Sequence, residues 1–525
     1  MPTNPTYPGV YIEEIPSGVR TIMGVATSIT AFIGRTLRGE VNEPITINSF
    51  GDFERTFGGL WVESRLGYAV RDFFFNGGAQ AIIVRLYHEE NGIISKATLD
   101  VDGLELMAAD EGVWGNNLRA RVEKEEEDVL EEIAEIYGVE KEELFNLTVC
   151  DTKTGAIEQF ANVTITDSSR RVDLVLKKQS QFVRVKTLPE DESVPMSHED
   201  PAEDTDIWED VNASTGVTNE VAEDLRLNED DFPGSGEDKT GIYALEKADL
   251  FNILCIPPYD EDDNVDYSSL IGKAAKYCED RRAMLLVDPP SEWYSKKDAK
   301  DNIKNIGTKS KNAALFFPRL KQPNALRDNQ MEEFVPCGAV AGIFARTDVE
   351  RGVWKAPAGL EATLVGVPQL SVPLTDNENG ELNPLGINCL RALPAVGRVV
   401  WGSRTLRGDD RLASEWKYIP IRRLALYIEE SLYRGTQWVV FEPNDEPLWS
   451  QIRLNIGAFM HTLFRQGAFQ GQTPKEAYFV KCDKETTTQD EINRGIVNIV
   501  VGFAPLKPAE FVIIKIQQMA GEILT

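Results

Sequence analysis

The pattern of apolar and polar positions divides this chain into regions that follow different rules. Between 245 and 395, short runs of consecutive apolar residues alternate with helical patterns. Two such runs are 251–256 and 283–287, and the segment 268–282 between them has the pattern of a helix. Runs that are apolar at every position are buried on both faces, and two of them joined by a helix are typical of parallel strands in a βαβ unit. We therefore predict an α/β domain over 245–395.

The region 21–90 also alternates apolar strands with a helix. Strands are predicted at Thr30–Gly34 and Ala81–Leu86, and a helix at Ser64–Phe75. The helix runs directly into Asn76, Gly77 and Gly78. An Asn-Gly-Gly stop is typical of a helix C-terminus where the backbone needs a positive φ.

From 396 to 508 the pattern changes to that of an α+β domain. Two amphipathic helices are predicted at 420–433 and 449–464, the second with Ser450 as its N-cap.

Two strands are predicted after these helices, at 477–482 and 496–504. Thr488 and Glu491 form a capping box that opens a short helix between them, and Gly495 closes that helix. Two strands are too few for a stable sheet. Further strands must therefore come from elsewhere.

Both ends of the chain have the pattern of strands that pair outside their own domain. Within the segment 509–525, the run 511–516 has apolar side chains at both parities, so a strand there has two hydrophobic faces. Pro505 and Pro508 lack backbone donors and make a semi-rigid spacer before it. Residues 7–15 are a β-prone segment within an extended arm over 1–20. The alternative is that both ends pair inside their own domain.

The acidity of the chain belongs to one module. Of the net charge of −30, the segment 121–240 contributes 33 acidic against 12 basic residues, whereas 401–525 holds 15 of each. A chain of 525 residues exceeds what one hydrophobic core usually serves, so several domains are expected. Such a negative field repels nucleic acid, and we expect no binding of DNA or RNA.

Within this acidic segment two patterns differ. Residues 123–143 have the pattern of a charged amphipathic helix, with Val129, Ile133 and Ile136 at helical spacing. Residues 189–238 carry 18 acidic residues and one basic residue, and are predicted to be loop or partly disordered. A solvated, solubilising face is the simplest interpretation, and a specific cation or partner site is the alternative.

Few positions carry the pattern of catalysis or metal binding. The run 260–266 alternates acids like a calcium loop, but Val265 stands where that loop needs glycine and Ile271 where it needs glutamate. The run 234–240 misses the spacing of a phosphate loop. The histidines are few for acid–base or metal chemistry: His88, His198 and His461. We expect no catalytic residue, no cofactor and no metal.

The cysteines and the chain start bear on location. The six cysteines lack C-x-x-C spacing and are predicted to be reduced and mostly buried: Cys150, Cys255, Cys278, Cys337, Cys389 and Cys482. The start has no basic or apolar leader, and no window reaches the length of a membrane span. We expect the protein in the cytoplasm of the producing cell and then in an assembled particle, without membrane insertion.

Four motifs in one order resemble the contractile tail sheath family, whose members form the outer sleeve of contractile phage tails and related injection machines. The resemblance covers 1–87 and 245–520 well and the stretch between them poorly. The motifs are YPGVYIEEI at 7–15, INCLRALPAVGRVVWGSRTL at 387–406, CDKETTTQDEINRGIVNIVVGFAP at 482–505 and APLKPAEFVIIKI at 504–516.

The resemblance implies a structural subunit that polymerises as stacked homo-hexameric rings around an inner tube protein and contracts without nucleotide. Baseplate and terminator or cap proteins are the other implied partners. The implied organisation is an N-terminal arm at 1–20, the first part of the outer and middle domains at 21–90, an outward-facing acidic insertion at 91–244, the middle domain at 245–395, the inner domain at 396–508 and a donated-strand arm at 509–525.

The family also implies residue roles. The arms of neighbouring subunits add strands to the pair of strands in the inner domain of a third subunit. The implied arm residues are Val10, Tyr11, Ile12, Phe511, Val512, Ile513, Ile514 and Ile516. The implied acceptors are Tyr478, Val480, Val497, Ile499 and Val501, and the candidates for contact with the tube are Arg453 and Arg465.

Two other functions stay open. One is an enzyme of α/β hydrolase type, since the family's middle domain has been likened to a subtilisin-type fold. The other is a non-contractile component of the same particle. No glycine-flanked serine with histidine and aspartate partners is visible, and a fold does not confer catalysis. The chain is therefore not expected to be an enzyme.

Overall fold

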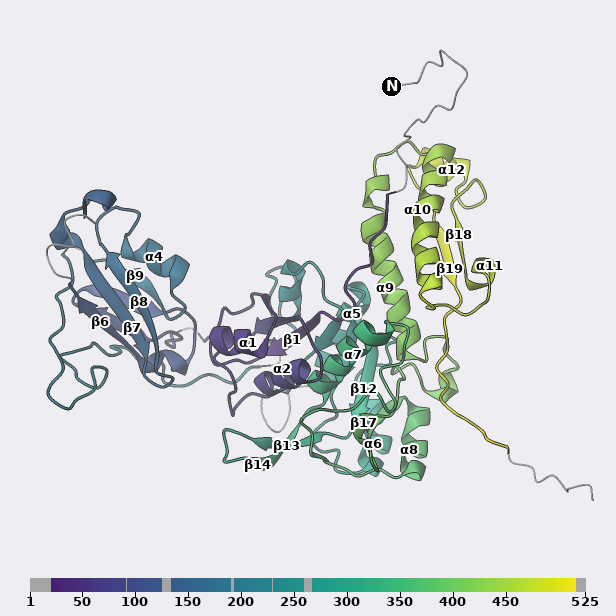
Figure 1. Ribbon diagram of the computed structural model, residues 1–525, viewed down its shortest axis with the longest axis horizontal. Helices are drawn as coiled ribbons and strands as arrows, with labels where there is room; N and C mark the ends of the chain where they lie inside the picture. Colours follow the sequence, from purple (N-terminus) through teal and green to yellow (C-terminus); the bar gives the residue numbers. More distant parts are fainter. Residues whose placement is uncertain are drawn as a thin grey trace, which may run out of the picture.

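The protein consists of a central α/β body and two further domains attached to it (Figure 1). The computed structural model describes residues 20–90, 92–124, 134–189, 193–228, 230–258 and 267–515. An insertion domain lies on one side of the central body and a C-terminal domain on the other, so the predicted mixed α/β, multidomain architecture is confirmed. None of the helices in these ranges is long and apolar enough to cross a membrane.

The central body is built on an eight-stranded sheet within the described ranges, in the order β17-β16-β12-β11-β10-β1-β3-β2. The six inner strands are parallel, and each edge strand is antiparallel to its neighbour. The strands are β1 (Thr30–Gly34), β2 (Ile45–Ile47), β3 (Ala81–Arg85), β10 (Ile253–Cys255), β11 (Met284–Val287), β12 (Ala313–Phe317), β16 (Ile387–Leu393) and β17 (Gly397–Val400).

Helices cover both faces of this sheet, which explains why its strands are apolar at every position. On β1, Ala31 and Ile33 face one hydrophobic cluster and Phe32 faces the other. The first cluster contains side chains of α5 (Tyr267–Asp280) and α6 (Lys296–Asn302). The second contains side chains of α1 (Phe50–Phe57), α2 (Leu66–Phe75) and α7 (Cys337–Arg351).

The elements predicted from the sequence in this body lie within one or two residues of their expected positions. α5 separates the parallel strands β10 and β11 in the chain. α2 ends at Phe75 with Asn76 as its C-cap, and Gly77 has a φ of 107°. Smaller elements complete the body: β13 (Leu320–Asn324), β14 (Gln330–Phe334), β15 (Gln369–Leu370) and α8 (Asp376–Leu382). Short 3-10 helices, labelled η, join them: η3 (Gly241–Lys247), η4 (Ile303–Asn305), η5 (Asn383–Leu385) and η6 (Asp410–Leu412).

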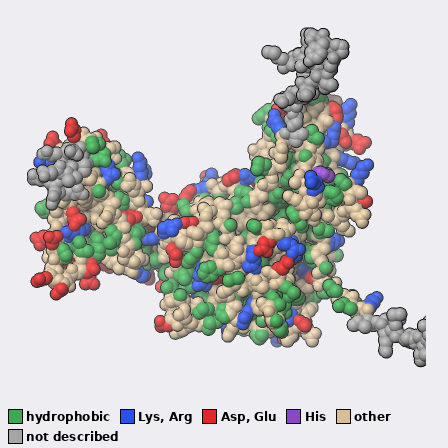
Figure 2. Space-filling view, viewed as in Figure 1, with side chains coloured by type: hydrophobic (Ala, Val, Ile, Leu, Met, Phe, Trp, Pro, Cys, Tyr) green, Lys and Arg blue, Asp and Glu red, His purple; other side chains and the backbone are tan. Residues whose placement is uncertain are grey.

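The insertion domain contains two three-stranded antiparallel sheets among its described residues. One has the order β4-β5-β9 and the other β6-β7-β8, and they share one core with α4. Its elements are β4 (Thr98–Val101), β5 (Leu104–Ala108), η1 (Val113–Asn117), β6 (Leu118–Glu123), η2 (Lys141–Glu143), β7 (Phe145–Asp151), β8 (Ala156–Val163), α4 (Val172–Gln179) and β9 (Val183–Thr187). Acidic side chains line its outer margin (Figure 2).

The helix predicted at 123–143 is wrong at its start, because β6 continues to Glu123 and pairs with β7. Residues 134–137 are helical, with Ile136 exposed, whereas Val129 and Ile133 lie outside the described residues. The described part of 189–238 is loop, as predicted. This loop is nevertheless packed: Thr215 pairs with Ala120, and Ala213 and Val221 are buried.

The end of the acidic segment belongs to the central body. Leu227 and Phe232 are each 2% exposed and pack in the same cluster as strands β10 and β11. The core of the insertion domain ends at Val221. The packing thus divides the chain before the expected boundary at 244.

The C-terminal domain packs two long helices against a small sheet. Its elements are α9 (Ile419–Gly435), η7 (Gln437–Val439), α10 (Glu446–Arg465), α11 (Pro474–Ala477), β18 (Tyr478–Lys481), α12 (Gln489–Asn493) and β19 (Val500–Phe503). The N-cap of α10 is Asp445 and not Ser450, since the Asp445 side chain accepts from the backbone of Leu448. The capping box of Thr488 and Glu491 is present as predicted.

Candidate assembly surfaces

The sheet of the C-terminal domain has two strands among the described residues, and each leaves one edge unpaired. β18 and β19 are antiparallel, with Tyr478 opposite Phe503 and Val480 opposite Val501. Their inner faces pack against α10 in the core of the domain, whereas Phe479 is 50% exposed. A sheet this small is stable only through what packs on it or adds to it. Its edges offer backbone donors and acceptors to another chain.

Two of the expected acceptor residues lie before the strand. Val497 and Ile499 pack against the domain core but have no strand conformation, because β19 begins at Val500 and not at 496. The backbone N–H of Asn498 donates to Thr487 Oγ1 at 3.1 Å, and its side-chain amide donates to Glu491 Oε1 at 2.7 Å. These bonds tie the segment to the start of α12 and prevent it from extending the ladder.

The C-terminal tail presents apolar side chains to solvent. Phe511, Val512, Ile513 and Ile514 are between 73% and 81% exposed, and none of them lies in a helix or strand. The tail leaves the body beside the central domain (Figures 1 and 2). Soluble proteins rarely expose consecutive large apolar residues without a partner. The remaining expected arm residues lie outside the described part of the chain: Val10, Tyr11, Ile12 and Ile516.

The two arginines proposed for tube contact differ. Arg453 donates to Glu446 Oε1 at 2.6 Å and to the backbone carbonyl of Cys482, and its side chain is 31% exposed. It is therefore engaged inside its own domain. Arg465 is exposed in the last turn of α10.

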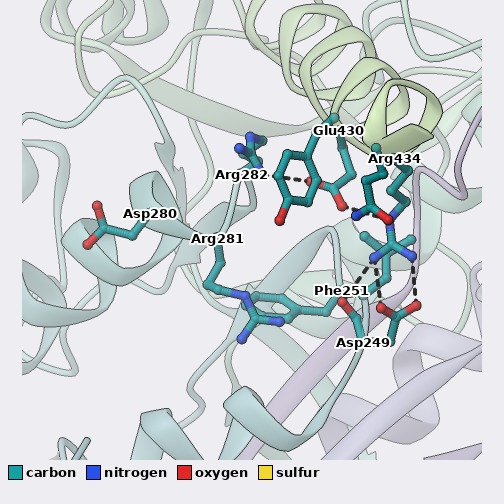
Figure 3. Close-up of a pocket in the computed structure, with 10 residues that line it drawn as sticks. Asp249, Phe251, Asp280, Arg281, Arg282, Glu430 and Arg434 are labelled. Carbon is teal, nitrogen blue, oxygen red and sulfur yellow. Dashed lines mark hydrogen bonds and ion pairs between the residues drawn. The ribbon is translucent and has the colours of Figure 1, made fainter. Parts of the chain in front are cut away.

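A polar recess of about 660 Å³ lies where α9 meets the central body (Figure 3). Arg434 donates to Asp249 Oδ2 at 2.7 Å and to Glu430 Oε1 at 2.7 Å, and Arg282 donates to Glu430 Oε2 at 3.0 Å. The hydrogen bonds that Arg434 donates to Asp249 lower the pKa of that carboxyl group, and the bonds that Asp249 and Glu430 accept from Arg434 raise the pKa of the guanidinium. Acidic and basic side chains line the recess in equal number. The ion pairs among them join residues of the central body to residues of α9, so we interpret the recess as part of the contact between the two domains.

In α/β sheets, ligands bind beyond the carboxyl ends of parallel strands, and here that position holds buried thiol and carboxyl groups. Asp288 follows β11 and accepts from the backbone of Cys337 at 2.9 Å. Burial raises the pKa of Asp288 to about 7 and the pKa of the Cys337 thiol well above its usual value. These groups are less than 3% exposed, and the thiol is held protonated. All six cysteines are free and buried, as predicted.

The histidines lie in three different parts of the molecule. His88 contacts Asp231, His198 lies between Val122 and Thr215 in the insertion domain, and His461 is exposed on α10. No group of three or more potential metal ligands gathers within the described ranges. The calcium-loop-like run 260–266 lies outside them. The run 234–240 is a turn in which Ser235 and Thr240 bond to each other.

Comparisons with known proteins agree with the architecture. The phage tail sheath protein central domain matches residues 234–406, and the phage tail sheath C-terminal domain matches residues 413–519. A putative prophage major tail sheath protein of Pseudomonas aeruginosa is 25% identical over 52% of this chain and 67% of its own length. The tail sheath protein of Vibrio phage KVP40 is 26% identical over 35% of this chain, which matches only 26% of that protein.

Solved structures with the same fold extend the likeness to nearly the whole chain. The sheath of an extracellular contractile injection system in its contracted state has a TM-score of 0.58 at 21% identity, covering 98% of this chain and 99% of its own. A sheath tail protein of Listeria innocua has a TM-score of 0.58 at 14% identity, covering 92% and 96%. With the two domain matches and the order of the domains, these findings place the chain in the contractile tail sheath family.

Proposed function

We propose that this protein is the structural subunit of a contractile sheath. Subunits polymerise as stacked homo-hexameric rings around an inner tube protein, between a baseplate and a terminator or cap protein, and contract to drive the tube through a target envelope. The subunit is made in the cytoplasm of the producing cell and ends in the assembled particle. The similarities favour this function over the hydrolase and over a non-contractile component.

The proposal rests on two features that occur together in one chain. One is a small sheet with open edges, and the other is an exposed apolar tail. No third strand joins β18 and β19 from the described part of the chain, and Phe511–Ile514 are exposed and β-prone. In the proposal, arms from two neighbours add strands to this sheet, one from 7–15 and one from 509–518. Addition of an extended segment to a sheet edge combines backbone hydrogen bonds with pockets for alternate side chains.

The energies are sufficient for a durable but reversible link. Burying five large apolar side chains of the tail gives on the order of 10 kcal/mol as an upper value, before association costs. About six strand hydrogen bonds add roughly 1 kcal/mol each. Each subunit makes several such links, so the mesh is more stable than any one of them. Tethered strands can stay paired while the bulky domains repack during contraction.

Two further surfaces follow from this proposal. The insertion domain faces outward, where like charges keep long assemblies from bundling. The exposed side of α10 faces the tube, with Arg465 as the more exposed of the two candidates and Arg453 held in its domain by Glu446.

The test is to shorten the tail without disturbing the body. Removal of 511–525 should yield a folded subunit that forms no cylinders, because the side chains described within it, at 511–515, contact solvent in the subunit. Ile514→Pro should weaken assembly more than it lowers the melting temperature, since it removes one strand donor. Ile514→Val is the matched control and should assemble normally. Melting temperature and electron microscopy of cylinders are measured side by side, and a sharply destabilised subunit would contradict the donated strand.

A further inference from the structure

The C-terminal tail is held by the central body and not by the sheet from which it emerges. Ala504 still pairs with the C-terminal domain, through its N–H to the carbonyl of Ala477 at 2.8 Å and its carbonyl to the N–H of Gln470 at 2.9 Å. Residues 506 and 507 are then exposed. Glu510 is the next anchor, with a side chain only 18% exposed. Its partners all lie in the central body or at the start of α9.

Four donors from three elements surround the Glu510 carboxylate. Arg404 binds it with both sides of its fork, Nε to Oε1 at 2.6 Å and Nη2 to Oε2 at 2.7 Å. Asn383 Nδ2 donates to Oε1 at 2.8 Å and the Tyr418 hydroxyl donates to Oε2 at 3.0 Å. Lys417 Nζ lies 3.8 Å from Oε2. A bidentate guanidinium supplemented by neutral donors is a strong and directional arrangement for a carboxylate.

The receiving site is rigid on its own. Arg404 is 1% exposed, and its backbone N–H donates to Asn388 Oδ1 at 2.6 Å. Asn388 is fully buried on β16, where its amide donates to the carbonyls of Leu315 and Arg404. Arg404 Nη1 also bonds to Asp410 Oδ1 at 3.1 Å. Because Asp410 would remain as a counter-ion, release of Glu510 would not leave the arginine unpaired.

We propose that Arg404, Asn383 and Tyr418 form a carboxylate receptor that clamps Glu510 and thereby fixes where the C-terminal arm starts and which way it points. Glu510 is a positioning residue for transfer of the arm to a second copy of this chain, and in this respect the inference rests on the proposed function. With the clamp closed, the free arm begins at Phe511. With the clamp open, it begins after Pro505 and reaches about 17 Å further, at roughly 3.4 Å for each of five extended residues.

The protonation states support the clamp. Burial alone would raise the pKa of Glu510, but the hydrogen bonds from Arg404 and Asn383 outweigh it and lower the pKa below its usual value. Burial likewise opposes the charge of Arg404, and the bonds to Glu510 and Asp410 outweigh it and raise the pKa. Both partners therefore stay charged in each other's presence at neutral pH.

A distance measurement tests the clamp without requiring polymerisation. The six native cysteines are buried, so spin labels can be attached selectively to Lys304→Cys on the central body and to Lys507→Cys, which is exposed three residues before Glu510 in the segment that the clamp holds. In the full-length subunit kept soluble at low concentration, we expect one narrow distance distribution. Glu510→Gln should broaden it and lower the clamped population about tenfold, and Tyr418→Phe should have a smaller effect. Glu485→Gln, at an exposed glutamate of the same domain, should leave the distribution unchanged.

Assembly supplies the second readout. Glu510→Gln should raise the concentration needed for cylinders about tenfold while the melting temperature of the subunit stays near that of the unmodified protein. A broad distribution in the unmodified protein, or one that Glu510→Gln leaves narrow, would refute the clamp. Equal assembly of Glu510→Gln despite a broadened distribution would refute the positioning role. A narrow, Glu510-dependent distance in a protein that never forms cylinders would support the clamp and refute the proposed function.

Discussion

The insertion domain and the C-terminal domain are attached to the same central sheet by different kinds of connection. Loops carry the chain from β3 into the insertion domain and back toward β10. The C-terminal domain is instead continuous with the body through α9, whose first residue, Ile419, packs in the central core, while Leu424 and Ile428 pack in the C-terminal core. A helix shared by two cores passes a rotation of one to the other, whereas loops absorb it.

Each junction contains a buried arginine, and the two arginines have different kinds of partner. At the helical junction, Arg423 pairs with Asp348 at 2.6 Å, and both side chains are 4% exposed. At the loop junction, Arg85 is 1% exposed and donates mainly to backbone carbonyls, at 2.7 Å to those of Gly39 and Glu111. The first arrangement depends on one side-chain pair and the second on several loop atoms. We therefore expect single substitutions to disturb the helical junction more.

The largest effect should come from cutting the insertion at the wrong place. Deletion of 121–240 would remove Leu227 and Phe232 from the central core, at a cost of about 3–5 kcal/mol for the phenylalanine alone. We expect loss of soluble folding. Replacement of only 97–221 by a glycine–serine linker should lower the melting temperature of the central domain much less, because it keeps Leu227 and Phe232 and removes from the body only acceptors such as the Glu111 carbonyl, which binds Arg85. Calorimetry of both variants measures this, and equal stability of the two would show that 227–232 are not part of the central core.

The next effect should come from Asp348→Ala. Removal of this carboxylate leaves the Arg423 guanidinium buried without a counter-ion in the described structure, with the Thr27 carbonyl at 2.8 Å and the Phe344 ring as neutral neighbours. An uncompensated buried charge costs about 3–5 kcal/mol, so the melting temperature should fall clearly. The control is Glu350→Ala, two residues further along α7 and exposed. A change no larger than that of the control would mean that the helical junction does not depend on this pair.

The smallest effect should be a pH response confined to the insertion domain. Burial, together with the charges of Arg121 and Arg119, lowers the pKa of His198 from 6.5. The unfolded chain then binds a proton before the folded domain does, so stability contributed here is complete above about pH 6.5 and falls as the pH is lowered. The melting temperature of the insertion domain should decrease by about 1–3 °C when the pH is lowered from 7 to 5.5. His198→Gln should flatten this slope and His461→Gln should not.

Local signals predicted the central and C-terminal elements well. Runs such as 251–256 are apolar at every position because helices cover both faces of their sheet, and the Thr488–Glu491 capping box depends on four neighbouring residues. The start of α10 was predicted three residues late and its N-cap five residues late, because Pro447 fits within the first turn and Asp445 can cap before it. These features are determined within a few residues of the chain.

Three other features have too weak a local signal to be predicted in this way. In β6, Leu118, Ala120 and Val122 alternate with charged residues, and this strand pattern was overlooked because charged residues dominate the region. The delayed start of β19 depends on bonds from Asn498 to α12. The clamp on Glu510 joins residues more than 90 positions apart, and a lone glutamate in the tail carries no local signal for it.

The position of the insertion has a consequence for how such a chain can change. The loops that carry it leave and rejoin the body between β3 and β10, and its core ends before Leu227 returns to the central one. A foreign domain whose ends lie close together could be grafted there without altering a strand of the sheet. Because every copy in a polymer carries the same graft, one gene fusion would display an enzyme or a binding domain at a regular spacing along the whole particle.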